Sequence, residues 1–402
     1  MTTDDTPKGP LAGLRVLDFS RILSGPYASM VLADLGAEVI KIEPLGTGDE
    51  TRNFPPFQGP LSHYFIALNR SKSSIALDLK SEEGAQIARE LAAESDILLE
   101  NFRPGVMDRL GLGFDALHAA HPGLIYCSIT GFGTQSPLAE KPAFDIVAQA
   151  LSGVMSLNRE PGQAPNKLSV PLGDMSGSIF SVFGILAALH ERASTGKGRH
   201  VEVAMLDSLI ALQGYLSQLY FTTGTSPEPQ GTRHPSIVPY GAFPTSDGHV
   251  IVACLTERFW QNFARCIGHP ELVDDARFSP YQNRLANRDA LEEIIAEAMA
   301  GGTTEHWLAQ LDAFDVPNAP ILSVGDALEQ EHVVSGGLVR QVSHPVAGDI
   351  RMVGSPLRFD GQHLPEPRAP QLLGEETEKV LRERLHLDEA RIKALKERGT
   401  IG

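Results

Sequence analysis

Cysteine and long apolar runs are both scarce in this chain of 402 residues. The three cysteines, Cys127, Cys254 and Cys266, lie far apart and form neither a CxxC pair nor a Cys/His metal-ligand pattern. This usage is typical of a reducing cytosol and predicts no metal site. The N-terminal segment MTTDDTPKGP is too polar for a signal peptide, and no run approaches the length of a membrane span. The sequence therefore predicts a cytoplasmic protein.

Basic residues are also few, because 34 lysines and arginines stand against 50 aspartates and glutamates, a formal net charge of −16. That charge argues against nonspecific affinity for nucleic acid or for an anionic membrane. An anionic ligand must therefore be held by local basic residues or backbone N–H groups. The nucleotide fingerprints GxGxxG and GxxxxGK[ST] are missing as well, which argues against a nucleotide-dependent oxidoreductase.

Strand-like and helix-like segments alternate through the first third of the chain. Strands are expected at 14–20, 38–44, 74–80, 96–102 and 124–133, and helices at 27–37, 81–95, 103–111 and 114–122. A turn at Ser24-Gly25-Pro26 separates the first strand from the first helix. This alternation predicts an α/β layered domain with a mostly parallel sheet.

Composition changes after a further predicted helix at 207–224, where a linker rich in proline, glycine and serine begins. A hairpin with its turn at Ser246-Asp247-Gly248 is expected next. Amphipathic helices follow at 257–268, 288–300 and 303–314. We therefore predict a large α/β domain at 1–225, a smaller α+β domain at 226–330, and a C-terminal segment at 331–402.

Asp174 stands where an extended segment gives way to a helical pattern. Apolar residues recur at helical spacing from Met175, which puts Asp174 at the expected N-cap. One interpretation is only structural, since aspartate is a common N-cap. The other is chemical: small neighbours leave room for a substrate atom, and helix N–H groups would stabilise an oxyanion beside a nucleophilic carboxylate.

Strings along nearly the whole chain resemble the class III coenzyme A transferase family, also called the formyl-CoA transferase or CaiB-BaiF-like family. They include LAGLRVLDFSRILSGPYASMVLADLGAEVIKIEP, NRSKSSIALDLK, ENFRPGVMDRLGLGFDAL, FDIVAQALSGVM and GKGRHVEVAMLDSL. The family's nucleophilic aspartate matches Asp174. The resemblance implies that this carboxylate forms an acyl anhydride and then an aspartyl-CoA thioester.

The resemblance also implies a CoA site. Its residues are Leu23, Ser24, Leu77, Asp78, Lys80, Asn101, Phe102, Arg103, Arg109, Phe144 and Asp145. Lys80, Arg103 and Arg109 are the expected phosphate ligands, although each is equally a candidate for a solvated surface charge. Pro44 stands where some members have an arginine. CoA thioester is expected as a substrate, with no permanently bound cofactor.

The residue type at position 144 distinguishes two reactions that members of this family catalyse. Relatives that racemise 2-methylacyl-CoA have a histidine base at this position, and a phenyl ring cannot transfer a proton. A CoA transferase is therefore favoured over a racemase, and a noncatalytic acyl-CoA binding protein is the other alternative.

The resemblance suggests a short dicarboxylate acceptor, such as succinate, mesaconate, itaconate or glutarate. Arg233, and also Arg52, would pair with its distal carboxylate, and His234 would face the acyl group. The chain has no long glycine-rich lid of the kind in formyl-CoA-specific relatives, which argues against oxalate and formate. The family fold implies a Rossmann-like large domain that includes the C-terminal segment, and two chains interlocked as a homodimer.

Overall fold

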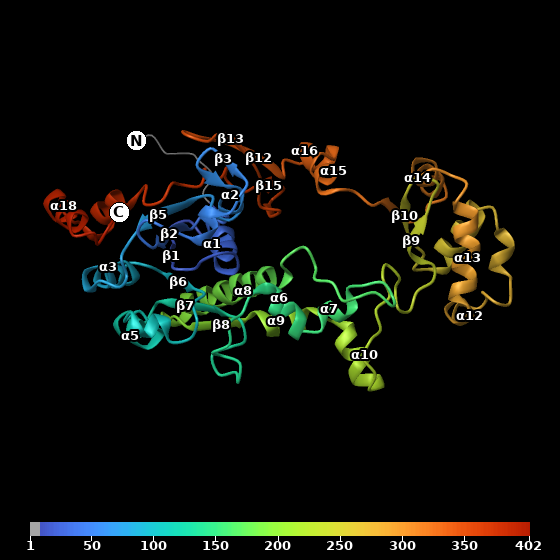
Figure 1. The fold of residues 1–402 in the computed structure, drawn as a ribbon, viewed down its shortest axis with the longest axis horizontal. Helices are drawn as coiled ribbons and strands as arrows, with labels where there is room; N and C mark the ends of the chain where they lie inside the picture. The colour runs from blue at the N-terminus through green and yellow to red at the C-terminus, as the bar shows by residue number, and fades with distance from the viewer. Residues whose placement is uncertain (1–8) are drawn as a thin grey trace. The chain divides into compact units, whose positions relative to one another are not determined.

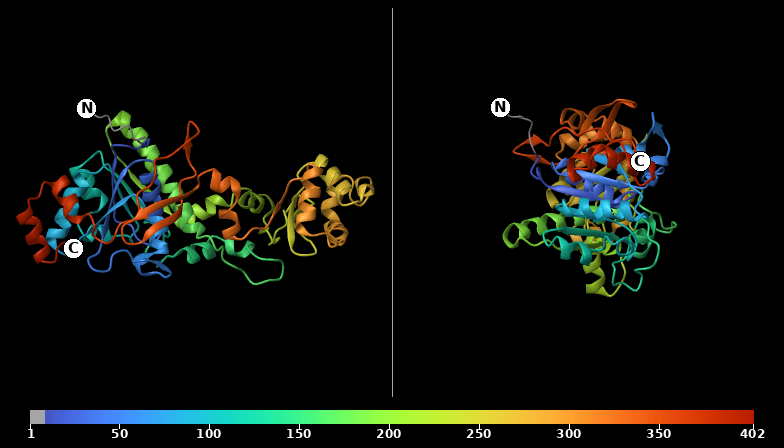
Figure 2. Two further views of the ribbon diagram at one scale, coloured as in Figure 1. Left: turned by 90° about the horizontal axis from the view of Figure 1, so that it is seen from above. Right: turned by 90° about the vertical axis from the view of Figure 1, so that its left-hand side faces the viewer.

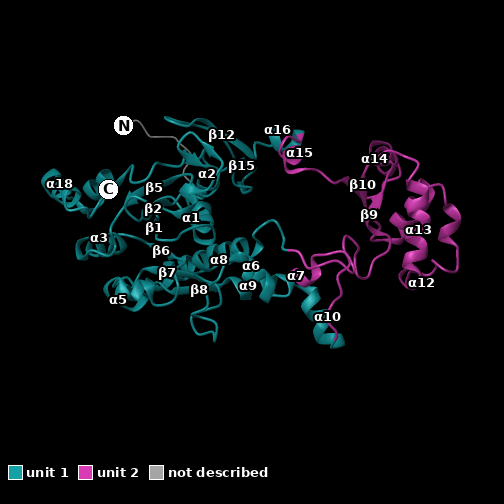
Figure 3. Ribbon diagram, viewed as in Figure 1, with its two compact units in different colours: residues 1–154, 167–224, 331–402 teal, residues 155–166, 225–330 magenta. Residues whose placement is uncertain are grey.

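The computed structural model describes residues 9–402. Residues 1–8, the start of the segment that was expected not to be a signal peptide, lie outside this range. The chain divides into two compact units, coloured in Figure 3. Unit 1 comprises residues up to 154 together with 167–224 and 331–402, and unit 2 comprises 155–166 and 225–330. Residues 155–166, assigned to the large domain from sequence, thus cluster with unit 2.

A six-stranded parallel sheet forms the centre of unit 1, as the sequence predicts (Figure 1). Its strands are β1 (Arg15–Asp18), β2 (Glu38–Glu43), β5 (Lys72–Ala76), β6 (Ile97–Glu100), β7 (Ile125–Thr130) and β8 (His200–Ala204). The order is β5-β2-β1-β6-β7-β8, so the direction of winding reverses between β1 and β6. In such doubly wound sheets ligands bind at the carboxyl ends of the two strands that flank the reversal.

Alternate residues of each strand enter cores on opposite faces of the sheet. Leu17 and Leu98 face a core closed by α3 (Glu82–Ala93), α17 (Thr377–Leu385) and α18 (Glu389–Glu397). Val16 and Leu99 face the other core, closed by α1 (Ser24–Asp34), α6 (Asp145–Leu151), α8 (Leu172–Thr195) and α9 (Met205–Leu212). Figures 1 and 2 show these two helical layers. The C-terminal segment therefore completes one face of the sheet.

Two elements of unit 1 differ between the sequence prediction and the structure. Ser24-Gly25-Pro26 is the first turn of α1 and not a separate turn, because proline needs no N–H partner in a first helical turn. The predicted helix at 207–224 is two helices, α9 and α10 (Tyr215–Thr223), separated at Gly214 with φ of 56°. A positive φ interrupts helical geometry, and glycine adopts it without steric cost.

Helix α8 corrects the expectation that no run approaches a membrane span. With 24 residues it is long and apolar enough to cross a membrane by length and composition alone. Core helices meet the same criterion, and α8 buries Val182, Ile185 and Ala188 in the core of unit 1.

Unit 2 is a small α+β structure. Its antiparallel sheet joins β9 (Tyr240–Pro244), β10 (His249–Ala253) and β11 (Asn318–Pro320). The predicted hairpin turn is present, and the Thr245 N–H donates to the Gly248 carbonyl oxygen at 2.9 Å. Helices α11 (Glu257–Cys266), α13 (Arg288–Met299) and α14 (Thr304–Ala313) cover this sheet.

Candidate functional site

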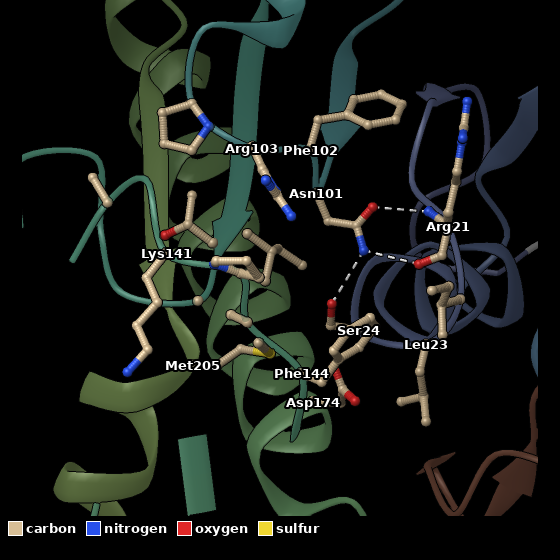
Figure 4. A pocket seen from close by; sticks show the side chains of 18 of the residues that line it. Arg21, Leu23, Ser24, Asn101, Phe102, Arg103, Lys141, Phe144, Asp174 and Met205 are labelled. Carbon is tan, nitrogen blue, oxygen red and sulfur yellow. Dashed lines mark hydrogen bonds between the residues drawn. The ribbon is translucent and has the colours of Figure 1, made fainter. Parts of the chain in front are cut away.

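Two loops meet at the reversal point of the sheet, one after β1 and one after β6. Asn101, just beyond β6, accepts a hydrogen bond from the Arg21 N–H and donates to the Arg21 carbonyl oxygen, both at 2.8 Å. It also donates to the Ser24 hydroxyl at 3.3 Å (Figure 4). One side chain thus fixes the path of the loop that leads into α1.

Buried charged side chains form hydrogen bonds with the backbone of the loop after β1. Ile22 has φ of 66°, a strained conformation for a β-branched residue. Its N–H lies 3.3 Å from both carboxylate oxygens of Asp49. Lys41, only 1% exposed, forms an ion pair with Asp49 at 3.0 Å and donates to the Ser20 carbonyl oxygen at 2.7 Å. The lysine holds the pKa of the Asp49 carboxyl well below its usual range despite burial. Strain of this kind persists where its surroundings fix it, here beside a ligand crevice.

A cavity of about 300 Å³ opens at this point, and we call it the Asp174 cavity. Seven of the residues predicted from sequence line it, namely Leu23, Ser24, Asn101, Phe102, Arg103, Phe144 and Asp174. Figure 4 shows Asp174 beside Ser24 and Phe144. The loops after β1 and β6, the segment before α6, and the first turn of α8 therefore converge on one carboxyl group.

Asp174 is not the N-cap of α8, contrary to the prediction. The helix begins at Leu172 with Pro171 as its N-cap, so Asp174 is its third residue. The carboxylate of Asp145 accepts the N–H of Gly173 at 2.8 Å and that of Asp174 at 3.4 Å. Asp145 therefore satisfies the helix end from another element. These two N–H groups are consequently not available for an oxyanion, but the Asp174 carboxyl is free of a capping role.

Burial raises the pKa of the Asp174 carboxyl to about 7, and the negative charge of Asp145 adds to this effect. A hydrogen bond from Ser24 acts in the opposite direction. Burial and then the charges of Asp174 and Asp145 raise the pKa of Tyr64 to about 12. A carboxylate destabilised in this way gains more than a solvated one from forming a neutral acyl derivative.

A second cavity of about 430 Å³, the Leu77 cavity, lies at the carboxyl ends of β1, β2 and β5. Its lining includes the predicted residues Leu77, Asp78, Lys80 and Phe102, among apolar side chains such as Phe19, Ile42 and Leu110. Arg21 and Phe102 line both cavities. Nine of the eleven predicted CoA residues thus divide between two cavities that share these two side chains. Asp145, which binds the start of α8, and Arg109 line neither cavity.

The remaining predicted residues lie elsewhere. Arg109 is exposed at the end of α4 (Val106–Arg109) and lines neither cavity. Arg233 and His234 belong to unit 2, where Arg233 pairs with Glu292 at 2.6 Å beside a separate cavity of about 840 Å³. Arg52 pairs with Glu43 at 2.6 Å, so its guanidinium is already engaged.

Several lining residues were missed from sequence. Arg21, Lys141 and Met205 line the Asp174 cavity. Arg21 and Met205 stand within strings that carry the family resemblance but were not singled out as site residues, and Lys141 stands outside those strings. Arg21 had one available signal, because it stands two residues before Leu23 in the same loop. Within residues 9–402, no group of three or more histidine, cysteine, aspartate or glutamate side chains is arranged to hold a metal ion.

A doubly wound sheet with a partly buried carboxyl group of raised pKa at its reversal point is typical of an α/β enzyme that binds its ligand in this crevice. The family model for CoA-transferase family III matches residues 11–377, and the chain belongs to this family and is a CoA-transferase.

Similar proteins carry related names. The chain is 36% identical over 393 residues to succinyl-CoA:glutarate CoA-transferase of Mus musculus, covering 98% of this chain and 90% of that one. It is 38% identical over 374 residues to acetyl-CoA:oxalate CoA-transferase of Acetobacter aceti, covering 92% and 95%. A solved CaiB/BaiF family protein from Brucella suis matches with a TM-score of 0.85 and 35% identity, covering 94% and 100%. The resemblance inferred from the sequence is confirmed.

Proposed function

We propose that this enzyme transfers CoA from an acyl-CoA donor to a short dicarboxylic acid through covalent intermediates on Asp174. The observation that carries the proposal is the Asp174 carboxyl itself. It lines the crevice at the reversal point, is free of capping duty, and has its pKa raised to about 7.

The chemistry proceeds by acyl exchange between oxygen and sulfur. The Asp174 carboxylate attacks the thioester carbonyl, and the C–S bond breaks to give an aspartyl acyl anhydride and CoA thiolate. The thiolate then attacks the aspartyl carbonyl, which releases the donor acid as carboxylate and leaves an aspartyl-CoA thioester. The acceptor carboxylate attacks the aspartyl-CoA thioester carbonyl, which expels CoA thiolate and gives an anhydride between Asp174 and the acceptor. The thiolate then attacks the acceptor's acyl carbon, which gives the acyl-CoA product and frees the Asp174 carboxylate. Covalent catalysis divides one difficult exchange into easier steps.

CoA would use both cavities of unit 1 in this proposal. Leu77, Asp78 and Lys80 would contact the end of CoA remote from sulfur, and Leu23, Ser24 and Asn101 would contact the pantetheine arm. Lys80 and Arg103, both exposed at the cavities, are suited to phosphate groups.

The acceptor class follows from the names of relatives. Among them are CoA-transferases named for glutarate, mesaconate and oxalate. An oxalate-named relative at 38% identity removes the argument against oxalate that rested on the missing glycine-rich lid.

Phe144, which lines the Asp174 cavity, offers no base for racemisation. Arg233 and His234 remain proposed contacts for the acyl or acceptor group.

We also propose that two chains form a homodimer. Large apolar side chains of unit 1 are exposed in a single chain, including Ile179, Phe183, Leu212, Tyr215 and Phe221. Exposed apolar surface of this kind marks a contact with another protein surface. Sedimentation equilibrium should give twice the mass of one chain, and a monomer at micromolar concentration would contradict the proposal.

The functional test is a panel of acyl-CoA donors against monocarboxylic and dicarboxylic acceptors. We expect CoA to move to at least one short dicarboxylate, and the Asp174→Asn variant to transfer it at least about 10³-fold more slowly. Exchange of the donor's α-deuterium without acyl transfer would instead identify a racemase.

A further inference from the structure

The junction of the two cavities in unit 1 is formed by Arg21 and Phe102. Among the described lining residues, these two side chains alone are common to the Asp174 cavity and the Leu77 cavity. A ligand that fills the Leu77 cavity and presents its reactive end to Asp174 must therefore pass Arg21.

The backbone of Arg21 is held in place while its side chain has only a weak partner. Asn101 binds both the N–H and the carbonyl oxygen of Arg21 at 2.8 Å. The guanidinium carbon lies 5.0 Å from the centre of the Phe102 ring. One guanidinium nitrogen lies 3.3 Å from Glu50, in a pair whose side chains are 32% and 48% exposed. Exposed pairs of this kind contribute little free energy and are readily exchanged.

We propose that Arg21 binds the diphosphate of the CoA substrate and exchanges its contact with Glu50 for phosphate oxygens. This inference rests on the proposed function, in which CoA spans the two cavities. The diphosphate lies between the adenosine and the pantetheine arm, so it falls at the junction when the thioester reaches Asp174. The planar guanidinium fork matches two phosphate oxygens.

Other cations at these cavities lie on one side of the junction. Lys80 lines the Leu77 cavity, whereas Arg103 and Lys141 line the Asp174 cavity. The formal net charge of −16 repels a polyanionic ligand, which makes a local cation at the junction more important. Glu50 then acts as a competitor that occupies Arg21 when the site is empty.

The test compares equilibrium dissociation constants for CoA, 3′-dephospho-CoA and pantetheine, measured by calorimetry with the full chain. Arg21→Gln should weaken CoA and 3′-dephospho-CoA equally, by about 10- to 100-fold, and leave pantetheine unchanged. Arg21→Lys should be intermediate. Glu50→Gln should tighten CoA by about two- to fivefold, and only while Arg21 is present. Arg199→Gln and Glu191→Gln are matched controls, because this exposed pair lines neither cavity.

Three results would overturn the assignment. If Arg21→Gln weakens CoA but not 3′-dephospho-CoA, the arginine contacts the 3′-phosphate. If it weakens pantetheine by the same factor, the substitution has disturbed the loop. If Glu50→Gln weakens CoA, Glu50 is not a competitor. A native protein that binds none of the three ligands would instead contradict the proposed CoA site as a whole.

Discussion

Two groups of carboxyls, one buried and one partly buried, lie near the carboxyl edge of the same sheet, and their pKa values are shifted in opposite directions. Asp49 is matched by Lys41 at 3.0 Å, and its pKa is lowered despite burial. Asp174 has Asp145 as its charged neighbour, and its pKa is raised to about 7. Compensated charge keeps the first group ionised as a support for the loop. The second group stays uncompensated, which is the state that favours acyl transfer to its oxygen.

The largest expected effect follows from removing the uncompensated carboxyl. Asp174→Asn should lower the rate of CoA transfer by about 10³-fold or more, because an amide oxygen cannot form the anhydride. The dissociation constant for CoA should change little. Transfer at near-native rate by Asp174→Asn would show that the reactive group lies elsewhere.

Breaking the compensated group should cost stability. Lys41→Met leaves the Asp49 carboxylate buried without its cation and the Ser20 carbonyl oxygen without its donor. We expect the free energy of unfolding in urea to fall by about 3–5 kcal/mol. Lys393→Met is the matched control, since Lys393 is 78% exposed and its pair with Glu397 should contribute under about 0.5 kcal/mol. An equal loss of unfolding free energy in the two variants would mean that the buried Lys41–Asp49 ion pair contributes no more to stability than an exposed one.

The two groups should also differ in how pH affects stability. The folded-state pKa of Asp174 is raised above its unfolded value, so folding favours the protonated form and stability falls as pH rises from about 4 to about 7. Asp174→Asn should therefore be more stable than the native chain by about 4 kcal/mol at pH 8, with the difference vanishing near pH 4. Thermal unfolding across this range measures it, and a difference that does not vary with pH would contradict the raised pKa.

The smallest expected effect concerns the neighbour of Asp174. Asp145→Asn removes a negative charge but keeps an oxygen that can accept the Gly173 N–H. The acidic limb of kcat/KM, which should have its midpoint near pH 7, should move to lower pH, because one cause of the raised pKa is gone. Burial, the larger cause, remains, so the shift should be partial. Asp145→Ala should in addition destabilise the chain by about 1 kcal/mol through loss of the helix cap.

Much of unit 1 could be predicted because its strands are apolar and its helices follow them regularly. Strand β8 was missed because HVEVA alternates exposed and partly buried residues, and at the edge of the sheet it has no continuous apolar run. The position of Asp174 was predicted to within three residues of the helix start. The sequence did not show that the Asp174 carboxyl has no capping role. The residue that accepts the N–H groups at the start of α8 is Asp145, which lies 29 residues before Asp174 in the chain.

The site could be predicted only in part, because contacts between residues far apart in the chain leave no local pattern in the sequence. The residues carried over from the family include Leu23, Asn101 and Phe102, and these do line the Asp174 cavity. The supporting pair of Lys41 and Asp49 was not predicted, because a lysine within the strand EVIKIE gives no indication of which loop will supply its partner. Contacts that join separate loops depend on the crossover geometry and not on local pattern.

The most direct test of the account is chemical trapping on Asp174 during turnover. The native enzyme is mixed with an acyl-CoA donor, quenched with hydroxylamine, digested and examined by mass spectrometry. The account predicts a hydroxamate on the peptide that contains Asp174. The modification should depend on the donor and should be missing when the Asp174→Asn variant is tested in place of the native enzyme. A hydroxamate on another residue, or turnover with an unmodified Asp174 peptide, would contradict it.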